Sequence, residues 1–271
     1  MIIADMHTHT TFSGDGKSTI EEMLDRAVEL GVQHYGITDH FDYDYTGVKG
    51  RYWTDAKAYF TKARELQEKY KDKIKIYVGA ELGYQNIPVM LDEINAIAEE
   101  YKPDFLINSV HFLTFDKTEL GEEQDRHSSY ERYFSWIRNS LDAPYPYDIV
   151  GHLSFCVRYA PFKERSFSYA EHQETLDDIL KKIIELGKVL EINSKASPAR
   201  FDGDARIEFV PSQEILQRYY DLGGRKISYG SDAHITDDIL RGRETAVETL
   251  KEIGFEYLTL PVRGEEIKIP L

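Results

Sequence analysis

The sequence contains almost no cysteine, since Cys156 is alone among 271 residues. One thiol can build neither a disulfide framework nor a zinc site of several cysteines. Long apolar runs are also missing, and no stretch approaches the ~20 residues that a membrane-spanning helix needs. The first residues have neither the basic start nor the apolar segment of a signal peptide. We therefore expect a cytoplasmic protein with no membrane contact.

Positive charge is scarce as well. Against 48 Asp and Glu residues stand 33 Lys and Arg residues, which gives a formal net charge of −15. A surface this acidic repels the phosphate backbone of a long nucleic acid. Hydrophobic residues nevertheless make up 41% of the chain, enough to furnish a core. Composition thus excludes intrinsic disorder and favours a small molecule over a long nucleic acid as the partner.

Short β-branched and aromatic runs alternate with longer segments of helical period. The predicted strands span residues 2–7, 34–38, 74–80, 105–110, 147–151, 188–193 and 226–231, and a further strand is expected over 257–260. The predicted helices span 19–30, 56–69, 88–101, 130–141, 171–186, 212–222 and 239–253. This alternation is typical of βα units around a parallel sheet or barrel. No break in composition suggests a linker, so we expect one α/β domain over residues 1–271.

Three stretches are predicted to be irregular: 41–54, 112–129 and 194–211. They are long compared with the connections of a compact domain, where the median is about 4 to 6 residues. The first is rich in aromatic side chains, which is unusual for a passive solvated loop. We expect these loops to serve function.

Six of the nine histidines fall at or just past the C-terminal end of a predicted strand, together with two carboxylates, and a third carboxylate follows the first strand. These candidate metal ligands are His7, His9, Asp15, His40, Glu81, His111, His152, Asp232 and His234. In a β/α barrel such strand ends converge on one face. The alternative interpretation, ordinary polar residues at strand ends, suits any single member but not all of them together.

The local spacing supports a metal site. His7 and His9 are two residues apart, so on an extended strand both rings project from one face. Asp232 and His234 repeat that spacing. Neutral imidazole with carboxylate oxygen is the ligand mixture that suits zinc, iron or manganese. Asp5 lies on the same strand face, where it either orients an imidazole or binds backbone amides.

These residues stand in motifs that resemble the PHP (polymerase and histidinol phosphatase) superfamily of metal-dependent phosphoesterases. The matching segments are 5–9 (DMHTH), 13–16 (SGDG), 38–40 (TDH), 79–81 (GAE), 109–111 (SVH), 151–152 (GH) and 231–234 (SDAH). The resemblance implies a distorted (β/α)7 barrel that holds three divalent ions. It implies one ion on His7, His9, Glu81 and Asp232, a second on Glu81, His111 and His152, and a third on Asp15, His40 and His234.

Within the superfamily the sequence is most similar to the stand-alone histidinol-phosphatase branch, through residues 154–158, 191–194 and Arg200. This resemblance implies hydrolysis of L-histidinol phosphate, a phosphate monoester of histidine biosynthesis. A hydroxide that bridges the two ions sharing Glu81 would attack the phosphorus. The predicted catalytic residues are Glu81, Asp232, His234 and Arg158. Phosphate binding is expected of Arg158 and Arg200, and further substrate contacts of Asn193, Asp42 and Asp116.

Two alternatives remain open at this stage. One is a PHP phosphoesterase that acts on nucleotides or on nucleic-acid ends, because acidity disfavours long polymers but not mononucleotides. The other is a non-catalytic, metal-stabilised PHP domain, as found within some polymerases. The complete ligand set favours an enzyme over the second alternative. No feature of the pattern indicates an oligomeric state.

Overall fold

The computed structural model describes residues 2–44, 46–111, 125–158, 160, 162–195 and 209–271. The strands are β1 Ala4–Asp5, β2 His34–Ile37, β3 His40–Tyr43, β4 Lys49–Trp53, β5 Lys75–Val78, β6 Ala80–Gly83, β7 Leu106–Ser109, β8 Ile149–Val150, β9 Val189–Asn193, β10 Ile227–Gly230, β11 Tyr257–Val262 and β12 Glu265–Pro270. The α-helices are α1 Ile20–Glu29, α2 Ala56–Tyr70, α3 Pro88–Tyr101, α5 Arg126–Ser140, α6 Gln173–Glu185, α7 Gln213–Asp221 and α8 Arg243–Ile253. Short 3-10 helices are η1 Phe155–Arg158, η2 Tyr169–His172 and η4 Thr236–Asp238.

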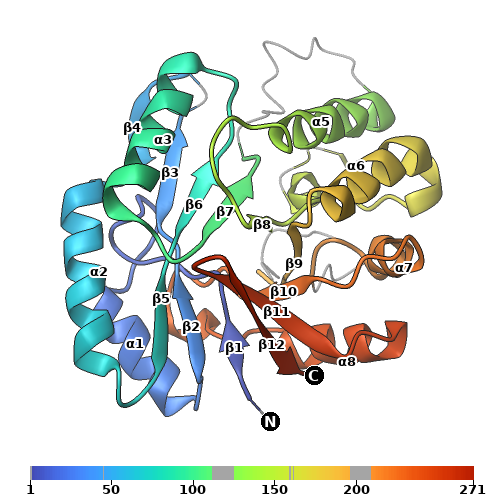
Figure 1. Ribbon diagram of the computed structural model, residues 1–271. Coiled ribbons are helices and arrows are strands. Elements are labelled where there is room, and N and C mark those ends of the chain that lie inside the picture. The colour runs from blue at the N-terminus through green and yellow to red at the C-terminus, as the bar shows by residue number, and fades with distance from the viewer. Residues whose placement is uncertain (1, 45, 112–124, 159, 161, 196–208) are drawn as a thin grey trace.

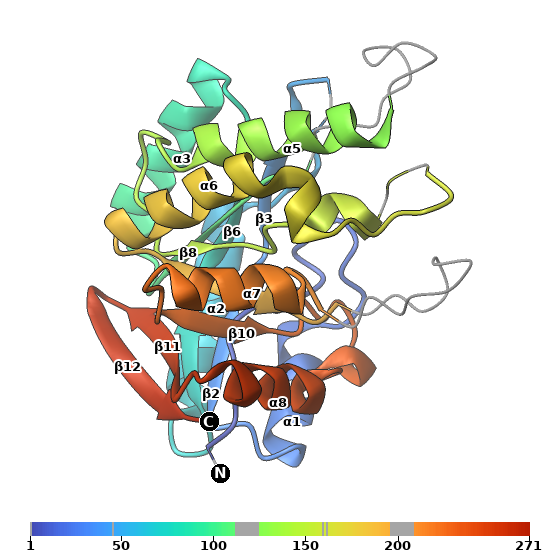
Figure 2. The same cartoon turned by 90° about the vertical axis from the view of Figure 1, so that its right-hand side faces the viewer.

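The predicted barrel is confirmed. Parallel pairing runs β1-β2-β5 in one sheet and β10-β9-β8-β7-β6-β3 in another, with β4 added antiparallel at its edge. Backbone hydrogen bonds join β1 to β10: Met6 N donates to Tyr229 O (3.0 Å) and Asp232 N to His7 O (2.8 Å). Figure 1 shows α1, α2 and α3 on one side of these strands and α5 to α8 on the other, and Figure 2 shows α5 to α8 stacked in chain order.

Two of the predicted strands differ from the expectation, because each is interrupted and forms two shorter strands. The strand predicted over 34–38 continues past residues 38–39 as β3, and the strand predicted over 74–80 breaks at Gly79 and continues as β6. The first halves pair in one sheet (β2 with β5) and the second halves in the other (β3 with β6). A side chain at Gly79 would lie 2.8 Å from the Phe105 ring, so close packing requires glycine at this break.

The stretch 41–54 was expected to be irregular, and this expectation is wrong. It forms most of β3 and all of β4, which pair antiparallel through Phe41 with Trp53. The helix expected over 130–141 begins earlier, at Arg126, because the Asp125 carboxylate caps it by accepting a hydrogen bond from Ser128 N (2.9 Å). The strand expected over 257–260 is confirmed as part of β11, which pairs with β12.

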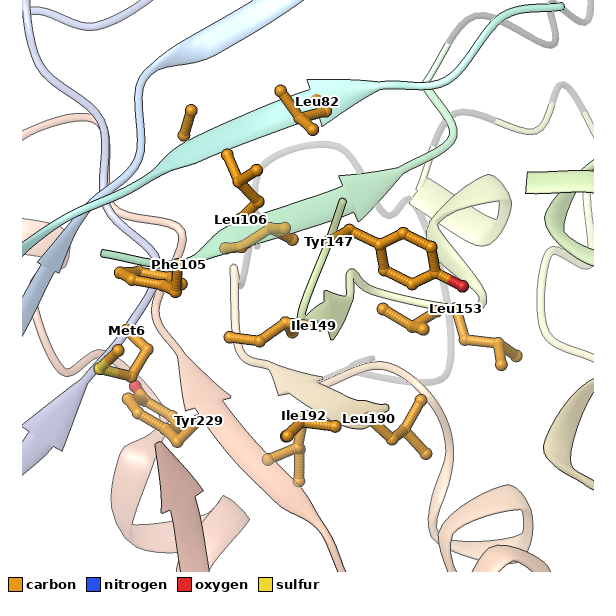
Figure 3. Packing of buried hydrophobic residues seen from close by; sticks show 14 of the residues in the cluster. Met6, Leu82, Phe105, Leu106, Tyr147, Ile149, Leu153, Leu190, Ile192 and Tyr229 are labelled. Carbon is orange, nitrogen blue, oxygen red and sulfur yellow. The ribbon is translucent and has the colours of Figure 1, made fainter. Parts of the chain in front are cut away.

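Apolar side chains fill the interior below the polar strand ends. Met6, Phe105 and Tyr229 are at most 1% exposed and lie next to one another in Figure 3. Ile149 and Ile192, from neighbouring strands, are fully buried. This core holds the strands in place and leaves their C-terminal ends free to carry polar groups. Among the helices that the structure describes, none combines the length and apolar character that a bilayer crossing requires.

Candidate metal centre

All nine predicted ligands come together around Glu81 of β6, although His40 begins β3 and Asp15 lies in the loop between β1 and α1. The Glu81 side chain is 1% exposed. One of its oxygens, Oε2, lies 3.2 Å from His7 Nε2, 3.3 Å from His9 Nε2 and 3.0 Å from His40 Nδ1. The other, Oε1, lies 3.1 Å from His111 Nε2 and 2.9 Å from His152 Nε2. A single carboxylate therefore touches five imidazole rings contributed by different parts of the chain.

The remaining predicted ligands complete two sides of this cluster. On one side, Asp232 Oδ1 lies 3.3 Å from His9 Nε2. On the other side, Asp15 Oδ2 lies 3.2 Å from His234 Nε2, and Asp15 Oδ1 lies 3.7 Å from His40 Nε2. Asp232 and His234 follow β10, which ends at Gly230, and Asp232 has a positive φ of 52°. The structure thus brings together the residues that the sequence predicted from their places at strand ends.

Hydrogen bonds on the outer nitrogens fix which way the rings offer their lone pairs. His7 Nδ1 lies 2.6 Å from Glu191 Oε1, and His111 Nδ1 lies 2.7 Å from Asp42 Oδ1. A carboxylate only accepts, so in each neutral ring Nδ1 carries the hydrogen and Nε2 carries the lone pair. Both Nε2 atoms point toward the Glu81 carboxylate. This carboxylate–imidazole arrangement is the one that orients histidines toward a metal ion.

Lone pairs face one another in this cluster. His7 Nε2 and His9 Nε2 are 3.0 Å apart, and His111 Nε2 and His152 Nε2 are 3.2 Å apart. Two neutral acceptors at such distances repel unless a cation lies between or beside them. Glu81 Oε2 and Asp15 Oδ1 are buried and accept no hydrogen bond from the described residues. The arrangement therefore fits bound divalent cations, which would satisfy these atoms together.

Burial and charge oppose one another at the central groups. Burial alone would raise the pKa of the Glu81 carboxyl, but nearby rings, led by His7 and His111, hold that pKa well below its usual range. Burial likewise disfavours charge on His7, yet the carboxylates of Glu81, Glu191 and Asp232 raise the pKa of His7 well above its usual value. Rings and carboxylates thus stabilise each other's charged forms, and the carboxylates favour positive charge among them, either as a proton on a ring or as a bound cation.

Asp42 has a different place from the predicted one. It was expected to contact the substrate from a loop, but it belongs to β3 and is 1% exposed. Its Oδ1 lies 2.7 Å from His111 Nδ1 and its Oδ2 3.1 Å from His40 Nδ1. The error came from ending the strand at residue 38: in the extended β3, Asp42 shares the inward face with His40. Its Oδ1 holds the His111 ring by a hydrogen bond, and its Oδ2 lies beside His40.

Two other acidic residues at the strand ends also hold structure together. Asp39, to which the sequence assigned no role, accepts hydrogen bonds from the backbone and hydroxyl groups of Thr10 and Ser13. Ser13 Oγ in turn lies 3.2 Å from His9 Nδ1. Of the two roles expected for Asp5, the structure shows the binding of a backbone amide: its carboxylate accepts a hydrogen bond from Ser231 N (3.0 Å). Burial raises the pKa of Asp5 to about 6. Asp39 thus supports His9 through Ser13.

Cationic side chains border the cluster at the end of β9. Arg158 is 4% exposed, and its guanidinium donates to Asn193 Oδ1 (3.0 Å) and lies 3.8 Å from Asp232 Oδ2. Asn193, which was predicted to contact substrate, is fully buried, and its Oδ1 accepts this bond from Arg158. Lys195, which the sequence did not single out, lies 3.0 Å from Asp232 Oδ1. The predicted contacts Arg200 and Asp116 lie outside the described residues.

A second group of possible ligands lies away from the strand ends, between α5 and η2. It consists of His127, Glu131 and His172. The two rings stack at 4.6 Å with an interplanar angle of 11°. Ligand lone pairs lie in the ring planes, so parallel stacked rings cannot both aim at one ion. The Glu131 carboxylate already binds His172 Nδ1 (2.6 Å) and Thr175 Oγ1 (2.6 Å), so this group is hydrogen-bonded packing.

Glu191 is the functional residue that the predicted site omits. It lies in β9, where its oxygens lie 2.6 Å from His7 Nδ1 and accept a hydrogen bond from His152 N (2.7 Å). The signal that could have identified it is a glutamate in the middle of the apolar strand 188–193. A buried carboxylate in such a strand needs a partner, and an inward-facing histidine supplies one.

Exchanging Glu191 for glutamine keeps the size of the side chain and removes its charge. We expect Glu191→Gln to weaken divalent-ion binding by about 10 to 100-fold, because the His7 ring becomes less basic and less firmly oriented. Titration of metal-free protein against a competing chelator measures this change. Glu185→Gln, on the exposed surface of α6, is the matched control. Equal ion affinity in Glu191→Gln and the control would show that Glu191 only fills space.

Comparison with known proteins agrees with this geometry. A histidinol-phosphatase from Lactococcus lactis is 29% identical over 258 residues, which cover 94% of this chain and 92% of that protein. The crystal structure of the histidinol phosphate phosphatase of L. lactis in complex with zinc, L-histidinol and phosphate superposes with a TM-score of 0.85 at 28% identity, covering 98% of this chain and 99% of that one. A Listeria monocytogenes structure with a TM-score of 0.73 and 24% identity, covering 89% and 99%, supports the fold. The family model of the PHP domain matches residues 5–195, and the chain therefore belongs to the PHP domain family.

Proposed function

We propose that this chain is a metal-dependent phosphatase that hydrolyses L-histidinol phosphate, and that residues 1–271 form a single catalytic domain. The observation that carries the proposal is the pair of imidazole lone pairs, His7 Nε2 and His9 Nε2, held 3.0 Å apart beside the Glu81 carboxylate. A bound divalent cation would satisfy both lone pairs and the carboxylate together. The similarity to the L. lactis phosphatase, whose structure contains zinc, L-histidinol and phosphate, supports the substrate.

The predicted grouping of ligands into three ion sites remains part of this proposal. His7, His9, Glu81 and Asp232 would hold one ion, Glu81, His111 and His152 a second, and Asp15, His40 and His234 a third. Divalent ions held there supply Lewis-acid chemistry: they activate water near neutral pH and neutralise charge on a phosphoryl group. The donor set accepts zinc, iron or manganese, and the zinc in the L. lactis structure favours zinc.

The chain's own side chains would hold the substrate in place. Arg158 presents a planar guanidinium that can bind two phosphoryl oxygens at once. Asn193 keeps it beside Asp232, and its guanidinium carbon lies 5.6 Å from the centre of the Phe155 ring. Because Arg158 is almost fully buried, its charge is poorly screened by water and acts strongly on a bound anion. Arg200 would provide a second phosphate contact.

A phosphate-release assay tests the proposed substrate. Protein reconstituted with zinc, iron or manganese is offered histidinol phosphate, nucleoside monophosphates and simple sugar phosphates. We expect kcat/KM to be highest for histidinol phosphate. A preference for nucleotides would establish the alternative phosphoesterase activity. No release from any substrate by protein that carries its ions would establish the non-catalytic alternative.

Loss of the Arg158 charge should weaken the handling of phosphate. We expect Arg158→Met to lower kcat/KM by about 10² to 10³-fold, and to weaken competitive inhibition by inorganic phosphate. Steady-state kinetics with and without phosphate measures both effects, while ion content stays unchanged. Arg138→Met, which removes the surface ion pairs of Arg138 with Asp142 and Asp178, is the control. Unchanged phosphate inhibition would show that Arg158 does not contact the phosphoryl group.

A further inference from the structure

Lys195 places its side-chain amine inside the candidate metal centre. It follows β9, two residues beyond Asn193, and its side chain is 26% exposed. Its Nζ lies 3.0 Å from Asp232 Oδ1 and 3.3 Å from His234 Nε2. Both of these atoms belong to the predicted ligand set. The ammonium therefore occupies a corner of the site that the ligands would otherwise offer to a metal ion.

The contacts of the His234 ring show what that corner requires. His234 Nδ1 lies 2.9 Å from the backbone oxygen of Asp232, a group that can only accept, so Nδ1 carries the hydrogen. Its Nε2 then carries a lone pair, which faces Asp15 Oδ2 at 3.2 Å. Two acceptors that face one another need a cation, and Lys195 is a cation within reach.

The Nε2 lone pair of His234 cannot serve two cations at once. A divalent ion bonded to it would displace the N–H of Lys195 from the same nitrogen. The ion and the ammonium would also repel each other strongly at such a distance in a partly buried site. The four-carbon stem and partial exposure of Lys195 give the ammonium room to move toward solvent. Ion and ammonium are therefore alternative occupants of this corner.

We propose that Lys195 is a built-in competitor of the metal ion that binds His234. With the ion absent, the ammonium neutralises Asp232 and satisfies His234 Nε2; when the ion binds, the ammonium leaves. This inference rests on the proposed metal centre. It has two consequences: the ion at His234 is bound more weakly than the ligand set alone would allow, and the metal-free protein is stabilised by Lys195.

Ion-binding measurements on variants test the first consequence. Metal-free Lys195→Met, which keeps most of the stem and removes the charge, is titrated with Zn²⁺ against a competing chelator, and ions per chain are counted by elemental analysis. We expect the weakest-bound ion to bind at least about tenfold more tightly than in the wild type. Lys195→Arg, which keeps the charge, should remain close to the wild type. Lys62→Met, on the surface of α2, is the control.

Thermal unfolding tests the second consequence without any measurement of activity. We expect Lys195→Met to lower the Tm of the metal-free protein, and this difference to vanish when Zn²⁺ saturates both proteins. Lys195→Gln serves as a second uncharged variant if the methionine variant does not fold. If the wild type binds no ions, the proposed metal centre itself fails. If the wild type binds ions and the affinities and metal-free Tm values are the same in the uncharged variants, only the inference about Lys195 fails.

Discussion

Glu81→Gln is expected to lower kcat/KM for phosphate release by about 10³-fold or more, and to reduce the number of ions that the protein retains. The carboxylate oxygens of Glu81 lie within 3.3 Å of nitrogens of five imidazole rings. A glutamine in its place supplies one oxygen and one NH₂ group, and the NH₂ group cannot bind a cation. The effects of residues that act as a unit are strongly non-additive, so the loss of one member can cost nearly as much as the loss of all of them.

The measurement combines steady-state kinetics with elemental analysis of the same preparation. Glu65→Gln, an exposed residue of α2, is the matched control and should retain activity and ions. Far-UV circular dichroism shows whether the barrel is retained. A folded Glu81→Gln protein with wild-type turnover would remove Glu81 from the proposed mechanism, whatever ions it carries.

The sequence could predict this site because the ligands occupy equivalent positions in repeated βα units. Once the strands are located, their C-terminal ends must converge in a barrel, and each ligand needs only its place at a strand end. Strand periodicity paired His7 with His9. Asp232 and His234 lie close together as predicted, but they follow the end of β10 and Asp232 has a positive φ of 52°. The barrel fold brings strand ends that are distant in sequence close together, so local patterns alone could identify these ligands.

The features that sequence reasoning missed depend on contacts between distant strands. Asp42 appeared to be a loop residue because the break between β2 and β3 resembles the end of a strand. Glu191 appeared to be an ordinary strand residue, since its partners His7 and His152 come from other strands. Local patterns therefore identified the groups that face the centre of the site, and overlooked those that hold them from outside.

The two carboxylates that hold the rings from outside, Asp42 and Glu191, change the electrostatic account of the site. The sequence suggested a rim with the carboxylates Asp15, Glu81 and Asp232. The structure adds Asp42 and Glu191, both about 1% exposed and both hydrogen-bonded to ring nitrogens. So many buried carboxylates within one small volume repel one another strongly unless cations accompany them. The fold tolerates them because imidazoles, Arg158 and Lys195 lie among them, and divalent ions would neutralise them far more completely.

Removal of divalent ions is accordingly expected to abolish turnover and to lower the Tm by roughly 10 °C. An ion present at about 1,000 times its Kd stabilises the folded state by about 4 kcal/mol, and 1 kcal/mol corresponds to about 2 to 4 °C in a chain of this size. The protein is treated with a chelator and dialysed, and its activity, ion content and Tm are followed together.

Restoring one ion at a time shows whether the nitrogen ligands matter. Zn²⁺, Fe²⁺ or Mn²⁺ should restore both turnover and Tm, because imidazole suits these ions. Mg²⁺ prefers oxygen ligands and should restore little of either, so it serves as the control for ionic strength and charge. If Mg²⁺ restored the Tm as fully as Zn²⁺ did, neutralisation of the carboxylates alone would explain the stability, and the oriented imidazoles would contribute only to turnover. Full activity in protein with less than one ion per chain would instead contradict the metal centre altogether.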